Sequence, residues 1–187
     1  MAFFSIIKSE SDWLTIEGDN MTNHPTFGDK LENVDYKTRY GVYAVIPNKD
    51  KTKIILVQAP NGSWFLPGGE IEAGENHLTA LERELIEELG FTADIGHYYG
   101  QADEYFYSSH RETYFYNPAY LYEVTQFTQV GNPLEDFNHL AWFSIEEAKS
   151  KLKRGSHKWG IDCWQKDQEK ITKLGQHFRK INAIILL

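Results

Sequence analysis

The chain has almost no cysteine and no long apolar run, and each absence excludes a class of protein. Cys163 is the only cysteine among 187 residues, which excludes a disulfide within the chain and a cysteine-based zinc site. No apolar stretch approaches the roughly 20 residues that a membrane helix needs, so we expect no membrane partner. The apolar patch at residues 3–7 is followed at once by acidic residues and has no basic segment before it, which argues against a signal peptide. We therefore expect a cytoplasmic protein.

Positive charge is also scarce. Lys and Arg number 19 against 27 Asp and Glu, which gives a formal net charge of −8. A chain this acidic lacks the general electrostatic footprint of a protein that binds nucleic acid. If the substrate carries phosphates, a bound divalent cation is the simplest way to offset the repulsion.

Aromatic residues, in contrast, are plentiful. They make up 14% of the chain, with 11 Tyr and 11 Phe, which favours a sheet-rich fold. The length suits one domain with appendages, and the sequence has no internal repeat and no low-complexity linker. We predict an N-terminal extension over residues 1–30, partly disordered, a domain of α/β character over residues 31–155, and a C-terminal helical extension over residues 156–187 that packs on the domain. Met21 is an alternative start, which would make the first 20 residues dispensable.

The chain before the first helix predicts short strands. Residues 40–46 and residues 53–58 have the composition of strands, and the turn residues 47–51 between them predict a hairpin. Residues 64–66 form a short apolar approach to Pro67-Gly68-Gly69, which indicates a turn.

A helix is predicted from about His77 to Leu89. Its apolar residues fall on one stripe at helical spacing, namely Leu78, Leu81, Leu85 and Leu89. Gly90 follows immediately and is a suitable C-terminal stop.

Strand patterns return after this helix. Residues 93–107 and residues 113–125 are rich in Tyr, Phe and Val, and residues 108–111 between them indicate a hairpin loop. Residues 140–143 predict another short strand. Ser144 then indicates the N-cap of a helix through Leu152, because Glu146 and Glu147 stand in its first turn.

The tail from Trp164 to Ile181 predicts a terminal amphipathic helix. Its apolar positions recur at helical spacing, at Ile171, Leu174, Phe178 and Ile181. We expect this face to pack on the body of the protein, and packing on a partner is the alternative.

Three glutamates of the first predicted helix share one face. Glu84, Glu87 and Glu88 stand at i, i+3 and i+4, on a side different from the leucine stripe. Their mutual repulsion would be removed by a hard cation with oxygen ligands, such as Mg²⁺ or Mn²⁺. A solvated acidic face would give the same triplet, because Glu is common on exposed helices. Arg83 adds a cation nearby, and Glu75 is its expected ion-pair partner.

The frame around the triplet is more specific than the triplet itself. Residues 69–91 match the pattern G-x5-E-x7-R-E-U-x-E-E-x-G-U, where U is a bulky apolar residue. All nine positions fit, namely Gly69, Glu75, Arg83, Glu84, Leu85, Glu87, Glu88, Gly90 and Phe91. The segment resembles the Nudix box, and the chain resembles a Nudix hydrolase of the MutT-like kind, with surroundings that extend the likeness over residues 40–152.

The resemblance implies an α/β fold, an α/β/α sandwich around a mixed β-sheet with the box as loop–helix–loop. It implies hydrolysis of a diphosphate linkage in a nucleoside diphosphate linked to another moiety, with Mg²⁺ as cofactor and Mn²⁺ as a substitute. Nucleoside triphosphates and dinucleoside polyphosphates are the leading small-molecule substrates, and a capped or triphosphorylated RNA end is the one nucleic acid retained.

The resemblance also assigns roles to the box residues. Glu84, Glu87 and Glu88 would coordinate the metals, often joined by the backbone carbonyl of Gly69. Glu75 and Arg83 would stiffen the loop that presents them, which completes the predicted catalytic set.

The general base is left open between the box and residues outside it. Glu84 or Glu88 would serve from within the box. Many relatives place a Glu shortly before the tryptophan of the late strand, but here Asn138 and His139 stand closest to that place. The outer candidates are Glu135, Asp136, Glu104 and Glu112.

Several alternatives remain at this stage. Tyr107 lies at the offset that marks pyrophosphatases of dinucleoside polyphosphates, although many tyrosines surround it, and Arg39 is a candidate phosphate contact. The competing class is a non-catalytic nucleotide-binding or regulatory module, against which the intact box argues. An isomerase on the same scaffold would need more Cys and His than a late Cys163 supplies. A homodimer is left open.

Overall fold

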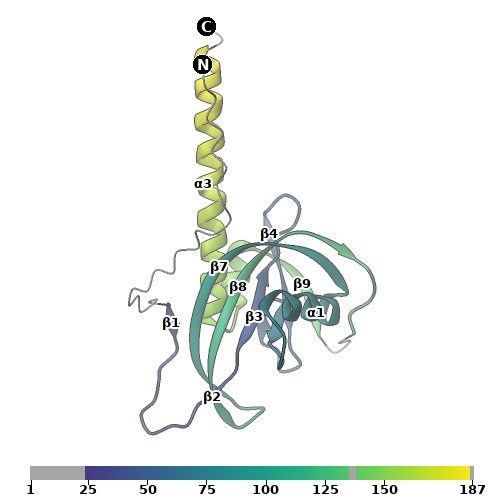
Figure 1. Ribbon diagram of the computed structural model, residues 1–187, viewed down its shortest axis with the longest axis vertical. Coiled ribbons are helices and arrows are strands. Elements are labelled where there is room, and N and C mark those ends of the chain that lie inside the picture. Colours follow the sequence, from purple (N-terminus) through teal and green to yellow (C-terminus); the bar gives the residue numbers. More distant parts are fainter. Residues whose placement is uncertain (1–23, 135–137, 186–187) are drawn as a thin grey trace, which may run out of the picture.

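The strands form two β-sheets in the computed structural model (Figure 1). The structure describes residues 24–134 and 138–185, and it describes the side chains of the last helix through Gln176. The larger sheet has the order β1-β7-β8-β3-β6, with β2 beside β8. Its members are β1 (Thr26–Phe27), β2 (Lys37–Thr38), β3 (Gly41–Val45), β6 (Gly68–Glu70), β7 (Phe91–Ser108) and β8 (Thr113–Gln129). The smaller sheet has the order β5-β4-β9, from β5 (Trp64–Phe65), β4 (Lys53–Gln58) and β9 (His139–Ser144). The larger sheet is mixed, because β8 is parallel to β3 and antiparallel to β7.

The predicted hairpin of β3 and β4 is wrong beyond its turn. The backbones of the two strands pair at its base, where the Ile55 N–H donates to the Ile46 carbonyl (3.2 Å) and Pro47 bridges to Ile54. They then enter different sheets, β3 between β8 and β6, and β4 between β5 and β9. Both strands are apolar on both faces, so each is buried best as the central strand of its own sheet.

The predicted turn before the first helix is also different in the structure. Gly68 and Gly69 form part of β6 and pair with Tyr43 and Val42 of β3. This short edge strand holds the start of the box against the larger sheet.

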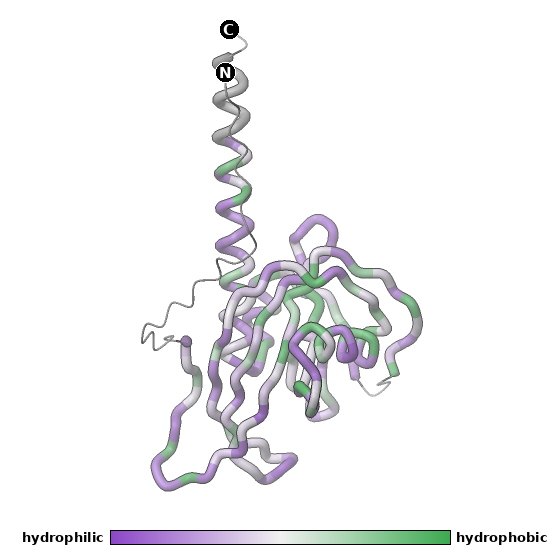
Figure 2. The backbone as a smooth tube through the Cα atoms, in the orientation of Figure 1, coloured by the Kyte–Doolittle hydropathy of each residue, from purple (hydrophilic) through white to green (hydrophobic). Residues whose placement is uncertain are grey.

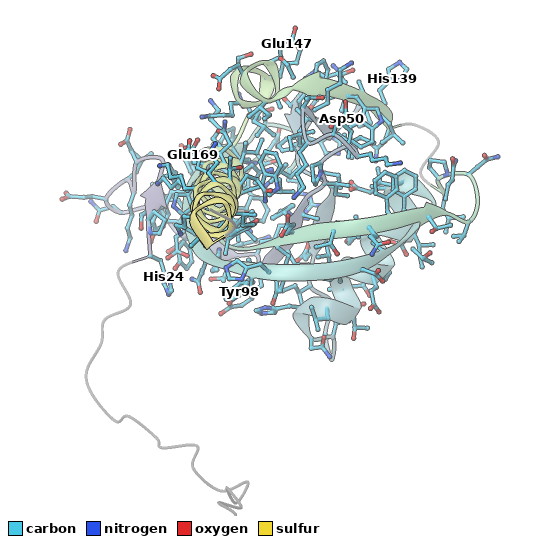
Figure 3. The ribbon with its side chains drawn as sticks, turned by 90° about the horizontal axis from the view of Figure 1, so that it is seen from above. His24, Asp50, Tyr98, His139, Glu147 and Glu169 are labelled. Carbon is cyan, nitrogen blue, oxygen red and sulfur yellow. The ribbon has the colours of Figure 1, made fainter. Side chains whose placement is uncertain are left out.

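Helices cover both faces of the larger sheet, which confirms the α/β/α sandwich. Helix α1 (His77–Leu89) packs on one face, while α2 (Ile145–Lys151) and the start of α3 (Gly155–Ile185) lie on the other. In Figure 3, Glu147 of α2 and Tyr98 of β7 lie on opposite sides of the long strands. Two apolar clusters result, one beneath α1 around Leu85 and one beneath α2 and α3 around Leu121.

The bounds of α1 agree with the prediction, and local signals explain them. The Asn76 side chain accepts hydrogen bonds from the N–H groups of Leu78 and Thr79 (2.9 and 3.0 Å), and Gly90 ends the helix at φ 68°. The buried stripe is shorter than predicted, because Leu78 is 47% exposed. Contact with the sheet begins one turn later, at Ala80 and Leu81.

Helix α3 starts earlier than predicted and ends away from the domain. It begins at Gly155, and Ile161 and Trp164 are buried in the core. Beyond them it projects from the sheets, with polar and apolar residues alternating along it (Figures 1 and 2). Ile171 and Leu174 are 60% and 57% exposed, so their predicted packing on the body is wrong. The side chains of Phe178 and Ile181 lie outside the described residues. Over the part of the chain that is described, no helix has the length and apolarity needed to cross a membrane.

Two leucines of one stripe test how the core holds α1. We expect Leu85→Ala to lower the free energy of unfolding by about 2–5 kcal/mol, because Leu85 is fully buried and its loss leaves a cavity. The same change at Leu78 should cost less than about 1 kcal/mol, since half of that side chain already meets water. Urea unfolding of both variants measures the difference. Equal losses would contradict the assigned packing.

Candidate active site

A bidentate ion pair joins α1 to the loop before it. Arg83 Nε donates to Glu75 Oε1 (2.8 Å), and Nη2 donates to Glu75 Oε2 (3.0 Å) and to the Glu70 carbonyl (2.9 Å). The Glu72 N–H also donates to Glu75 (2.9 Å). These contacts to Arg83 and then to the Glu72 N–H lower the pKa of Glu75 to about 2, so its carboxylate is charged at neutral pH. The predicted ion pair is therefore present.

The three clustered glutamates gather around this pair and β6. Arg83 Nη1 donates to Glu84 Oε1 (2.9 Å) and to Glu87 Oε2 (3.0 Å). Glu88 Oε2 accepts a hydrogen bond from the Gly68 N–H (2.8 Å). The face predicted from sequence spacing thus lies against the strand that starts the box.

Two glycines let β6 pass this close to the carboxylates. A Cβ at Gly69 would collide with the carboxylate of Glu84. A Cβ at Gly68 would collide with the Val42 carbonyl, and its φ of 128° is open only to glycine. The strand therefore passes close to the carboxylate of Glu84, which a side chain at Gly69 would displace.

This donor set suits a hard cation, although the carboxylates do not surround one point in this conformation. Within residues 24–134 and 138–185, no three His, Cys, Asp or Glu side chains are placed to hold a metal ion. Glu84 and Glu87 are instead bonded to Arg83, and Glu88 to β6. Carboxylate and carbonyl oxygens are the ligands that Mg²⁺ prefers, so the chemistry of the set fits that ion. Coordination by Gly69, Glu84, Glu87 and Glu88 stays a prediction.

A cavity of about 390 Å³ opens beside the carboxylates. Gly68 and Glu88 line it together with three arginines, Arg39, Arg111 and Arg154, and three phenylalanines, Phe65, Phe106 and Phe115. Its volume lies in the range of small-molecule sites. Arg39, the predicted phosphate contact, is among the lining residues, whereas Tyr107 is not.

Several lining residues were missed from the sequence, among them Arg111, Arg154 and His157. Arg111 lies in the turn between β7 and β8, whereas Arg154 and His157 lie where α3 begins, far along the chain from the box. The available signal was the run of basic residues over positions 151–158, which is unusual in an acidic chain. No recognised motif includes this run.

His157 is a buried, neutral hydrogen-bond donor. Its Nδ1 accepts a hydrogen bond from the Leu66 N–H (3.0 Å), and the residue is 1% exposed. Burial, followed by the nearby charges of Arg154 and Arg39, lowers the pKa of His157 well below its usual 6.5. The single ring proton therefore resides on Nε2.

The candidate bases outside the box differ in whether they line the cavity. Glu104 is buried, and its Oε2 accepts hydrogen bonds from Ser156 N–H (3.0 Å) and Oγ (2.7 Å), so it holds the start of α3. Neither Glu104 nor Glu112, in the turn between β7 and β8, lines the cavity. Asn138 lines it, and the exposed His139 begins β9. Glu135 and Asp136 lie outside the described residues.

Fold and site together define a class, an α/β/α protein whose first helix presents carboxylates to an arginine-lined cavity. Comparison with known proteins agrees with this class. The sequence profile of the NUDIX domain matches residues 37–164. The chain therefore belongs to the Nudix family.

The more similar proteins include two curated enzymes and one solved structure. The chain is 44% identical over 62 residues to "CTP pyrophosphohydrolase" of Escherichia coli K12, covering 30% of this chain and 45% of that protein. It is 36% identical over 62 residues to "RNA pyrophosphohydrolase" of Ruthia magnifica, covering 33% and 34%. A NUDIX hydrolase from Nitrosomonas europaea superposes with a TM-score of 0.54 at 25% identity, over 70% of this chain and 90% of that one. The matched segments thus span less than half the length of these curated relatives.

The ion pair of Glu75 predicts a specific dependence of stability on pH. The pKa of Glu75 falls from 4.5 to about 2 on folding, so its stabilising effect is complete above pH 4.5 and is lost as the pH falls toward 2. We expect the free energy of unfolding to fall less for Glu75→Gln than for the wild type as the pH is lowered from 4.5 to about 2. Urea unfolding at a series of pH values measures this, and Glu72→Gln, an exposed neighbour in the same loop, is the control. If Glu75→Gln and the wild type gave parallel curves, the ion pair would not contribute.

Proposed function

We propose that the protein is a Mg²⁺-dependent pyrophosphohydrolase, which cleaves a diphosphate linkage in a nucleoside diphosphate joined to another moiety. One observation carries the proposal. Glu84, Glu87 and Glu88 gather against β6, and Glu88 also lines the cavity beside them. A diphosphate held at the carboxylates would therefore have the rest of its molecule in the cavity.

The box residues divide into ligands and supports in this proposal. Glu84, Glu87, Glu88 and the Gly69 carbonyl would hold the metal. When bound, Mg²⁺ neutralises diphosphate charge and lowers the pKa of a coordinated water. Arg83 and Glu75 would keep the helix and the preceding loop in register, through the bidentate contact between them.

A carboxylate is needed to take the proton of the attacking water. Glu88 is the only box acid among the residues that line the cavity, so we assign it this role ahead of Glu84. The outer acids Glu104 and Glu112 do not line the cavity, which favours a base within the box.

Nucleoside triphosphates and dinucleoside polyphosphates are the substrates we propose first. The cavity has room for a nucleoside, and its three phenylalanines supply rings on which a base can stack. The names of two similar proteins, a CTP and an RNA pyrophosphohydrolase, are compatible with this class.

Charge-neutral variants of the box test the metal site. We expect Glu84→Gln and Glu88→Gln each to lower kcat by more than about 100-fold, because an amide replaces a carboxylate that binds the metal directly. Loss of a residue that only hydrogen-bonds to a metal ligand already costs about 10- to 100-fold. Glu82→Gln is the matched control, since Glu82 lies on the same helix with an exposed side chain. Excess chelator should abolish turnover, and added Mg²⁺ should restore it.

The substrate panel contains nucleoside triphosphates, dinucleoside polyphosphates, ADP-ribose, NADH and 5′-triphosphorylated RNA. Hydrolysis of at least one with Mg²⁺ is the expected result. Near-normal activity of Glu88→Gln would show that the metal assignment is wrong. Tight nucleotide binding without turnover of any substrate would favour a non-catalytic module instead.

A further inference from the structure

The cavity is positively charged although the protein is strongly acidic. Its described lining, from residues 24–134 and 138–185, contains three guanidinium groups and one carboxylate, that of Glu88, which belongs to the carboxylate cluster. The net charge of the chain is −8, so this local excess does not reflect overall composition. Like charges held in one cavity repel unless a ligand or a partner of opposite charge offsets them.

The carboxylates next to the arginines do not balance them fully. Arg39 Nε donates to Glu70 (3.0 Å), and Arg111 approaches the same carboxylate at 4.0 Å. Arg154 reaches Glu104 at 3.8 Å, beyond hydrogen-bond distance. Among the residues that the structure describes, the carboxylate partners of these three guanidinium groups are Glu70 and Glu104.

Arg154 packs against an aromatic ring in addition to its long ion pair with Glu104. Its guanidinium lies 3.1 Å from the centre of the Phe106 ring, and its side chain is 17% exposed. The Oε2 atom of Glu104 is engaged by Ser156. Stacking fixes the plane of the guanidinium and leaves its N–H edge for hydrogen bonds in the cavity.

His157 adds a neutral donor to the same wall. Its Nδ1 is an acceptor, so Nε2 carries the proton. The residue is 1% exposed and lines the cavity. A neutral ring N–H in this wall supplies a donor for an oxygen atom of a ligand.

We propose that the cavity binds a phosphate group of the substrate that is not part of the cleaved diphosphate, through Arg39, Arg111, Arg154 and His157. The inference rests on the proposed function, because it concerns the remainder of the same substrate. Planar guanidinium forks match the oxygens of a phosphate, and a second anion offsets the surplus charge. The group is either a phosphomonoester on the nucleoside or a further phosphate of a polyphosphate chain.

Binding without metal tests the site apart from catalysis. With chelator present, calorimetry measures the affinity for two series of ligands. The first series is AMP and adenosine 3′,5′-bisphosphate, and the second is AMP, ADP and ATP. Both series are repeated with guanine nucleotides. We expect an added phosphate to raise affinity by about tenfold or more, the gain of a charge-assisted contact. A gain in the bisphosphate identifies a nucleoside phosphomonoester, and a gain from ADP to ATP identifies a further phosphate of a polyphosphate chain. No binding, or no gain in any series, overturns the proposal.

Three variants assign the gain to the cavity. Arg111→Gln and Arg154→Gln should each remove most of it, whereas Lys173→Gln removes one positive charge from the exposed part of α3 and should leave it unchanged. Arg111 is half exposed and lies in a turn, so we expect Arg111→Gln to keep the fold. It therefore tests the site even if Arg154→Gln destabilises the protein by removing the stack on Phe106. A gain that persists in Arg111→Gln and in folded Arg154→Gln contradicts the site.

Failure of this inference and failure of the proposed function give different results. Mg²⁺-dependent turnover with no phosphate-dependent gain retains the hydrolase and overturns the phosphate site. A gain that depends on Arg111 and Arg154, without turnover of any panel substrate, supports the phosphate site and overturns the hydrolase.

Discussion

The guanidinium of Arg83 is the contact on which the site depends. Its Nε and Nη2 bind Glu75, its Nη1 binds Glu84 and Glu87, and Nη2 also reaches the Glu70 carbonyl. One cation thus contacts three carboxylates while it joins α1, β6 and the loop between them. Lysine has no planar fork and could not make these contacts together. Without this group, Glu84 and Glu87 would lose the hydrogen bonds that hold them beside it and the cation that reduces their mutual repulsion.

The separation of the two sheets creates the cavity beside that face. Because β3 and β4 diverge after their turn, the start of α3 packs against the larger sheet and brings Arg154 and His157 to the pocket. Arg39 precedes β3, and Arg111 lies in the turn between β7 and β8. Segments far apart in the chain therefore supply cations to one place. An acidic surface and a basic cavity direct a phosphorylated ligand to the site, since the rest of the protein repels it.

Signals that act over a few residues predicted most of the local structure. Gly90 marks the end of α1, and Ser144 forms a capping box with Glu147 at the start of α2. The pairing of Glu75 with Arg83 and the shared face of the box glutamates also follow from sequence alone. These features depend on helical geometry and on neighbours within two or three turns, and so they need no knowledge of the remaining fold.

The sequence by itself determined the box, its helix and the chemical class of the ligand that the carboxylates suit. Only the tertiary structure decided that β3 and β4 belong to different sheets, that Leu78 and Ile171 meet water, and that the basic run at 151–158 contributes to the site. The reason is physical. Burial and charge density at a residue depend on what packs against it, and long-range packing leaves no periodic mark in the sequence. The bond to be cut is encoded locally, whereas the cavity that holds the rest of the substrate is assembled from distant segments.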